Sequence, residues 1–149
     1  MYNFNLEPVL KHRKLVEENL QKELAVLKLS LVNERKRLQT YKESRSKFLV
    51  ELHRKQEEGT TISDVFLYLP FIEQLSKDIE KQNKTVSDLE KDVEQKRQDL
   101  VEASKKKKTL EKLKDKGLKA YKQEMIKNEQ EFLNEVAVNQ FNGKIRRER

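Results

Sequence analysis

Six residues, GTTISD at positions 59–64, interrupt a chain that otherwise repeats like one long helix. Gly59 suits the position just after a helix, where a left-handed backbone is common. Thr61 or Ser63 can cap a following helix by accepting hydrogen bonds from its free N–H groups. The stretch therefore predicts a short connection between two helices, and a short connection favours an antiparallel hairpin.

Apolar residues recur at alternating steps of three and four on both sides of this stretch. Upstream, the steps begin at Leu10 and end at Leu52, and nine of the thirteen positions are apolar. Downstream, they begin at Ile72 and end at Leu110, and nine of the twelve positions are apolar. Beyond Leu110 the register is expected to slip by one residue, with Gly117 at the slip. Seams of this kind predict coiled-coil helices.

We expect an all-α protein that forms a long antiparallel two-helix coiled-coil hairpin with a C-terminal helical overhang. The expected parts of this single coiled-coil hairpin (1–149) are helix one at 6–57, a turn with a short helix at 58–70, helix two at 71–141 and a basic tail at 142–149. A turn centred near residue 64 would place residue i opposite about residue 128 minus i, which leaves residues after about 122 without a partner. The competing interpretation is a parallel dimer of one continuous helix, and Gly59 and Pro70 argue against it.

Composition excludes several classes of protein. Charged residues make up 40% of the chain and hydrophobic residues 35%, with no cysteine. That leaves too little apolar sequence for a compact core, no disulfide framework and no run approaching the ~18–20 residues of a membrane span. Basic and acidic residues number 13 and 8 in residues 1–57, 6 and 11 in 58–104, and 14 and 7 in 105–149. An antiparallel hairpin would bring the two basic ends to one pole.

No arrangement of residues in the sequence indicates catalysis. The two histidines, His12 and His53, have no His or Cys three or four residues away, so they do not form a metal site. Adjacent carboxylates such as Glu17 and Glu18 point apart on a helix, so they do not form a catalytic pair. The sequence also contains no glycine-rich loop of the kind that binds phosphate. We therefore expect a protein that is not an enzyme and needs no metal or cofactor.

Two basic clusters remain open to two interpretations. Lysines occupy all four positions of Lys105–Lys108, and Arg146, Arg147 and Arg149 lie at the end of the sequence. They could bind an acidic partner or nucleic acid, or they could form a solvated helix face with a frayed tail. Nucleic-acid readers often interleave aromatic and basic residues, and here the aromatic residues lie elsewhere. The pattern favours the solvated face, and no nucleic acid is expected.

The most apolar stretch of the chain is VFLYLPFIEQL, residues 65–75. A two-stranded seam needs only two positions in seven, whereas Val65 to Leu69 cover more than one face of any helix. These side chains could cap the end of the hairpin. They could also form an exposed apolar patch, which usually marks a partner site.

Three motifs in this order resemble the bacterial flagellar export protein FliJ family. The first, FNLEPVLKHR, matches at Phe4, Leu6, Glu7, Val9, Leu10 and Arg13. The second, YLPFIEQLSKDIEKQ, matches at Tyr68, Phe71, Ile72, Leu75, Ile79 and Gln82. The third, FLNEVA, matches at Leu133, Asn134, Glu135 and Ala137. Two positions depart from the family pattern: Pro70 stands where Gln is frequent, which predicts a helix boundary or kink, and Asn134 replaces the usual Asp.

The resemblance implies a component of the flagellar type III export apparatus, and hence a part in flagellum biogenesis, motility and chemotaxis. Family members are stalk-like couplers between the hexameric cytoplasmic export ATPase and the membrane export gate protein, and they also handle export chaperones. The implied location is cytoplasmic, peripherally associated with the inner face of the cell membrane at the flagellar base, without direct membrane insertion. The implied export-gate contact is Tyr68, Phe71, Ile72, Leu75 and Ile79. The implied ATPase-ring contact is Phe4, Leu6, Leu10, Arg13, Leu133, Glu135 and Ala137.

Three alternatives compete with this interpretation. A stalk protein of a virulence-type secretion system would share the hairpin and the ATPase partner. A coiled-coil nucleic-acid-binding arm would bind duplex with a steep salt dependence. A plain scaffold or dimerising coiled coil would differ from a monomeric hairpin in its mass in solution.

Overall fold

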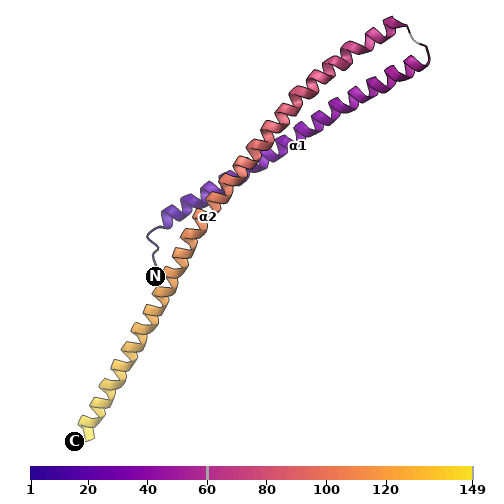
Figure 1. Ribbon diagram of the computed structural model, residues 1–149. Helices are drawn as coiled ribbons and strands as arrows, with labels where there is room; N and C mark the ends of the chain where they lie inside the picture. Colours follow the sequence, from indigo (N-terminus) through magenta and orange to yellow (C-terminus); the bar gives the residue numbers. More distant parts are fainter. Residues whose placement is uncertain (60, 149) are drawn as a thin grey trace. The chain divides into compact units, whose positions relative to one another are not determined.

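The computed structural model describes residues 1–59 and 61–148. This part of the chain holds two α-helices, α1 (Glu7–Glu57) and α2 (Ile62–Glu148), and no strand. Figure 1 shows the two helices joined by a short connection. The fold is an all-α helical hairpin, as expected, and not one continuous helix. Thr60 of the expected turn and Arg149 of the expected basic tail lie outside the described residues.

The connection has the backbone that its sequence predicts. Gly59 has a φ of +82°, in the left-handed region, and its N–H donates to the carbonyl of Gln56 at 3.4 Å. On the other side, the carbonyl of Thr61 accepts from the N–H of Asp64 at 3.1 Å, so Thr61 occupies the N-cap position of α2. Glycine reaches this φ without steric cost, which ends α1 and reverses the chain.

The second helix is longer than expected at both ends. It begins at Ile62 instead of residue 71, and it runs to Glu148 through the expected basic tail. Pro70 therefore lies inside α2, where we expected a boundary. The proline ring is exposed to solvent. Before it, Val65 and Tyr68 are half-buried, and Tyr68 packs against Phe48 of α1, so tertiary packing outweighs the one missing hydrogen bond.

The chain packs as two compact units. The turn unit is Glu17–Glu102, and the terminal unit is Met1–Val16 with Ala103–Arg149. Each unit contains a segment from both helices.

The core of the turn unit is the predicted heptad seam. Every seam position from Glu17 to Leu52 and from Ile72 to Leu100 is buried or half-buried. The most deeply buried apolar side chains are Leu24, Leu31, Leu52, Ile79 and Val86. The seam also reaches further back than expected, since Val65 and Tyr68 continue the same frame and are half-buried.

The pairing between helices in the turn unit differs from the expected register. Lys96 forms an ion pair with Glu23 at 2.8 Å, and Arg35 forms one with Glu90 at 3.0 Å. A turn centred near residue 64 would have placed these α1 residues opposite about residues 105 and 93. The difference arises because α2 already begins at Ile62, so the connection is shorter and lies earlier in the chain.

In the terminal unit the seam keeps its earlier frame as far as Tyr121. Leu10 is only 1% exposed, and Ala103 is also buried. Beyond Leu110, half-buried positions follow at Lys114, Gly117 and Tyr121, which keeps the earlier frame of steps. In the expected shifted frame Leu118 is half-buried too, whereas Met125 and Phe132 are exposed. The apolar pattern of the sequence did not predict this frame, because Lys114 and Gly117 are not apolar residues.

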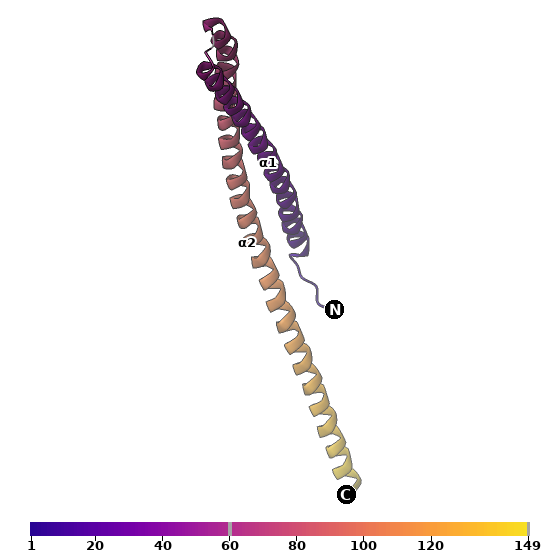
Figure 2. The same cartoon turned by 90° about the vertical axis from the view of Figure 1, so that its right-hand side faces the viewer.

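The last part of α2 is an overhang, which confirms the sequence prediction. From residue 122 to 148, all positions except Val136 and Gly143 are exposed. Figures 1 and 2, two views at right angles, both show this part of the helix with no other helix beside it. Neither helix in the described part of the chain carries the length of apolar sequence that crossing a membrane requires.

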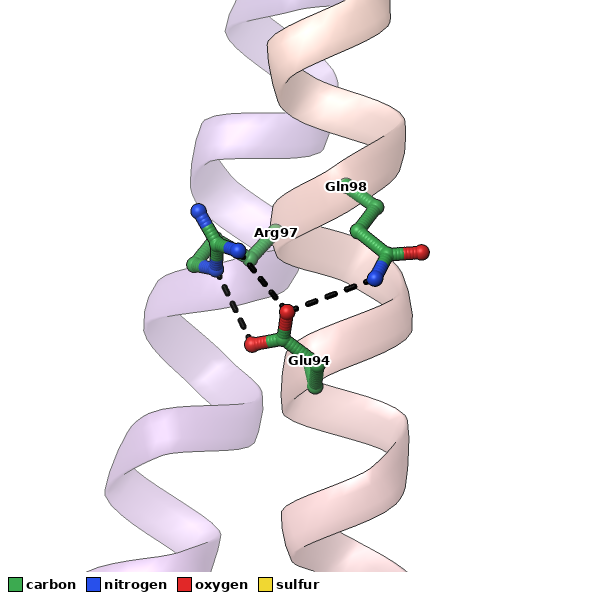
Figure 3. Close-up of polar contacts among 3 residues, drawn as sticks. All are labelled: Glu94, Arg97 and Gln98. Atoms are coloured by element: carbon green, nitrogen blue, oxygen red, sulfur yellow. Dashed lines mark hydrogen bonds and ion pairs between the residues drawn. The ribbon is translucent and has the colours of Figure 1, made fainter.

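Interactions between neighbouring side chains stabilise α2 on its solvent-exposed face. The clearest group is Glu94, Arg97 and Gln98, which point toward one another in Figure 3. The guanidinium of Arg97 donates twice to the Glu94 carboxylate, at 2.8 and 3.0 Å, and the Gln98 amide donates at 3.4 Å. The hydrogen bond from Arg97 is the largest cause that lowers the pKa of Glu94 below its usual value. Pairs at this spacing stabilise a helix locally.

Candidate docking surfaces

Large apolar side chains face solvent at the start of α2, beside the turn. Besides Ile62 at the first position of the helix, they are Phe66, Leu67, Leu69 and Phe71, each more than 40% exposed. We call these last four the turn-proximal patch. The side chains lie outside the two seam positions of their heptad, so the partner helix leaves most of their surface uncovered. An exposed cluster of this kind usually marks an interaction surface.

An aromatic cluster fixes the position of this patch. Phe48 of α1 stacks on Phe71 with 5.7 Å between ring centroids, and it meets the edge of Tyr68 at 6.3 Å. The ammonium of Lys55 lies over the Tyr68 ring, 4.9 Å from its centroid. The hydrogen bond with Tyr68 is the main cause that raises the pKa of Lys55. The turn-proximal patch is therefore held on a rigid base contributed by both helices.

The five expected gate residues divide between the two faces of α2. Phe71 is exposed, Tyr68, Ile72 and Leu75 are half-buried, and Ile79 is buried. Four of them face α1 because they occupy seam positions. The expected set did not include Phe66, Leu67 and Leu69, which are the side chains that a partner could reach. Extending the heptad frame back to Val65 would have separated these outward positions from the seam.

In the terminal unit, the first residues of the chain are anchored on α2. The Met1 amine donates to the Tyr121 hydroxyl at 3.0 Å, and the rings of Tyr2 and Tyr121 lie 5.6 Å apart. Tyr2 also contacts Gly117, where a methyl group would lie 2.9 Å from the Tyr2 Cζ and nearer still to its hydroxyl. Gly117 thus leaves the space that the Tyr2 ring needs on the surface of α2.

An ion pair reinforces this anchoring. The Lys114 ammonium lies 2.8 Å from the Glu7 carboxylate, at the first residue of α1. The hydrogen bond from Lys114 is the largest cause that lowers the pKa of Glu7. The position is also favourable for an acid, because a carboxylate at a helix N-terminus interacts well with the helix dipole.

The seven expected ATPase-ring residues form two separate groups. Leu10 is fully buried, Phe4 and Arg13 are half-buried, and Leu6 is exposed. The other group consists of Leu133, Glu135 and Ala137, all exposed on the overhang. Tyr121, which contacts the N-terminal residues, precedes Leu133 by about 18 Å of helix at 1.5 Å per residue. The structure therefore does not bring the two groups together in one patch.

The terminal unit is strongly basic. Its sequence holds 17 basic and 8 acidic side chains. The lysine run at 105–108 is partly built into the hairpin, since Lys107 is half-buried at a seam position and both Lys105 and Lys107 have interaction partners. No group of three or more His, Cys, Asp or Glu in the described residues could hold a metal ion.

These features define the class of the protein: an all-α coiled-coil hairpin with exposed apolar side chains in its turn unit and an excess of basic residues in its terminal unit. The family model of the flagellar FliJ protein matches residues 2–146, and the chain belongs to this family. It is accordingly a component of the flagellar export apparatus, with partners in the export machinery. Comparison with curated proteins and with solved structures gives no match to either.

Proposed function

We propose that the chain is a non-enzymatic, stalk-like coupler that links the hexameric export ATPase to the membrane export gate protein, and that it also handles export chaperones. We place it in the cytoplasm, peripherally associated with the inner face of the membrane at the flagellar base. Family membership supports the export role. The observation that carries the coupler is the exposure of large apolar side chains on two different units, the turn-proximal patch and the overhang.

The gate contact in this proposal is the turn-proximal patch. Phe66, Leu67, Leu69 and Phe71 contact the gate protein directly. The remaining members of the expected set hold these residues in place through the seam and the aromatic cluster: Tyr68, Ile72, Leu75 and Ile79. Exposed aromatic side chains on a rigid base are typical anchors of protein interfaces, because they bury much area and lose little conformational freedom.

The ATPase contact in this proposal belongs to the terminal unit. Leu6, Leu133, Glu135 and Ala137 are exposed and contact the ring directly. Phe4, Leu10 and Arg13 pack within the unit and keep the N-terminal segment on α2. The excess of basic residues suits an acidic ring interior, and complementary charge speeds association and fixes orientation.

If the chain is a coupler with two separate contacts, a variant can lose one contact and keep the other. The variant Leu67→Ser/Phe71→Ser removes two patch side chains, and we expect it to weaken gate binding by at least about tenfold. The variant Phe132→Ser/Leu133→Ser changes two exposed overhang residues, and we expect it to lose most stimulation of ATP hydrolysis by the purified export ATPase. Each variant should leave the other activity near the wild-type value.

Val101→Ser is the matched control, because it changes an exposed apolar residue of α2 outside both surfaces. It should leave both activities unchanged, and far-UV circular dichroism should show all variants helical. A variant that lost both activities while remaining helical would contradict the assignment of separate contacts. Full gate binding and full ATPase stimulation in both variants would reject the coupler on these surfaces.

A further inference from the structure

The middle of α1 carries apolar side chains on the face opposite to its seam. We define the α1 outer stripe as Ala25, Val26, Leu29 and Val32, all of which are exposed. The three larger side chains are 45–65% exposed. Their spacing of three, four and seven places them on one face of the helix. The buried seam residues Leu24 and Leu31 lie on the other face.

The hairpin itself does not need this stripe. Outward positions of a two-stranded coiled coil are normally polar. The corresponding positions two heptads further along α1 follow this rule. They hold four exposed polar residues: Gln39, Thr40, Glu43 and Ser46. The same unit is therefore built with polar residues at corresponding places. Isolated exposed apolar residues are common on any surface, but four on one face of so polar a helix form a patch.

A shallow depression, open to solvent, lies beside the stripe, between the two helices of the turn unit. Its volume is about 510 Å³, and its walls include Val26 and Leu27 of α1. The Lys96–Glu23 ion pair and Lys22 complete its lining. A side chain of a helix lying along the stripe can rest in this depression, with apolar contact to Val26 and Leu27 and polar contact to the charged residues around them.

The charges around the stripe are mainly basic. Lys22 and Lys36 share the heptad position of Leu29, one heptad before and one after it, and Lys28 lies at the side. All three lysines are exposed. Glu18, on the same outward face, lies beyond Lys22 and away from the stripe. Acidic residues on a bound helix would complement this border.

A second copy of the chain fits this face less well. Parallel packing in register would place each lysine opposite its own counterpart. Four small to medium apolar side chains per copy also provide far less than the roughly 1,200–2,000 Å² that a stable protein interface buries. The stripe suits a single amphipathic helix that binds and dissociates.

We propose that the α1 outer stripe is a docking surface for an amphipathic helix of a partner protein, whose apolar face is bordered by acidic residues. Such a helix lies along α1, places apolar side chains on Val26, Leu29 and Val32, and pairs its acidic residues with Lys22, Lys28 and Lys36. The surface is separate from the residues assigned above to the gate and to the ATPase ring, so it is a third contact of the hairpin.

A designed peptide tests this proposal. The probe is a fluorescent helical peptide of about 20 residues, long enough to cover the stripe, with leucines on one face and glutamates beside them. Its binding to the full chain is measured by fluorescence anisotropy. Val26→Glu/Leu29→Glu should weaken binding at least about tenfold by placing like charge and polar groups at the contact. Thr40→Glu, at the heptad position of Val26, should leave binding unchanged.

A second peptide, with lysines in place of the glutamates, should bind the wild-type chain at least about tenfold more weakly. The proposal is overturned if the two peptides bind alike, or if Val26→Glu/Leu29→Glu binds the acidic peptide as the wild type does. Should that variant lose helicity by circular dichroism, Val26→Ser/Leu29→Ser is judged by the same criteria.

Two further results would assign the face to a different occupant and so overturn the proposal. One is a wild-type dimer in analytical ultracentrifugation that the double variant converts to monomer. The other is co-sedimentation with phosphatidylglycerol vesicles that the double variant abolishes. None of these measurements contains the export ATPase, the gate protein or a chaperone, so their outcome does not depend on the proposed coupler function.

Discussion

At the scale of single residues, Gly117 shows how one missing side chain shapes the terminal unit. The residue is half-buried at a seam position, and the Tyr2 ring occupies the space that its side chain would fill. Tyr2 and Met1 both contact Tyr121, one turn further along α2. In the sequence, Gly117 marks an interruption of the apolar pattern. In the structure it occupies a position of the heptad seam and leaves space for the Tyr2 ring, which holds the N-terminal residues on α2.

We expect Gly117→Ala to release the N-terminal residues while stabilising the helix. The new methyl group would meet the Tyr2 ring and displace it, whereas alanine in place of glycine favours a helix interior by roughly 0.5–1 kcal/mol. Chymotrypsin should then cleave faster after Tyr2 and Phe4, as mass spectrometry of a time course would show.

Gly143→Ala is the matched control, because nothing lies within 4 Å of a methyl group at that position. It should give the same gain in helix stability with no change in cleavage near Tyr2. Equal cleavage rates in the wild type and both variants would show that Tyr2 does not depend on the space at Gly117.

At the scale of the helices, Pro70 is the least expected feature. Inside a helix, proline removes one backbone hydrogen bond and its ring crowds the preceding turn, at a cost of about 3 kcal/mol. The segment before it nevertheless remains helical, because Val65 and Tyr68 extend the seam and Phe48 of α1 packs on Tyr68 and Phe71. Tertiary packing therefore offsets the cost of the proline.

Replacing this proline should stabilise the hairpin. We expect Pro70→Ala to raise the free energy of unfolding by about 1–3 kcal/mol, since the ring is exposed and makes no contribution to the core. Urea unfolding followed by circular dichroism measures the change. Lys77→Ala, at the same heptad position one repeat later and also exposed, should change stability by less than about 0.5 kcal/mol. A Pro70→Ala variant no more stable than wild type would mean that the backbone is already relaxed around the ring.

Heptad periodicity was sufficient to predict the helices and their buried faces, because each seam residue contacts neighbours at fixed spacing. It did not predict the start of α2, since Pro70 is a strong local signal and the aromatic contacts that overcome it join residues far apart in sequence. It also misplaced the frame after Leu110, because Lys114 and Gly117 are held there by Glu7 and Tyr2. Side-chain pairing between helices is not visible in a one-dimensional pattern.

The same limit applies to the candidate surfaces. The family motifs identify Tyr68, Ile72, Leu75 and Ile79, whose spacing reflects packing against α1. The side chains that face outward, such as Phe66 and Leu67, appear only once the frame of the helix is known. A motif therefore combines residues that build the hairpin with residues that contact a partner, and burial separates the two.

At the scale of the whole molecule, ion pairs between the helices occur in both units. Glu7 pairs with Lys114 in the terminal unit, and Glu23 pairs with Lys96 in the turn unit. Glu23 raises the pKa of Lys96, chiefly through their hydrogen bond, which favours the charged form of the lysine. Exposed pairs of this kind contribute little individually, and salt weakens them. Their pH dependence nevertheless provides a test of each contact.

The acid dependence of the Glu7–Lys114 pair has a definite sign. The pKa of Glu7 is lower in the folded chain than its ordinary value of 4.5, so the folded state binds fewer protons there than the unfolded state. The contribution of the pair is therefore complete above that ordinary value and disappears as the pH falls through the lowered pKa. We expect Glu7→Gln to lower the Tm by on the order of a degree or two at pH 7.

This difference in Tm between the wild type and Glu7→Gln should shrink below about pH 4 and vanish once Glu7 is protonated in the wild type as well. Thermal unfolding followed by circular dichroism from pH 7 to pH 2 measures it. Glu129→Gln removes a carboxylate from the exposed overhang and serves as the control for net charge. It should match the wild type at every pH. A difference for Glu7→Gln that persisted at pH 2 could not come from the ion pair, because the wild-type carboxyl is then neutral too, and it would instead assign the stabilisation to packing of the side chain at the start of α1.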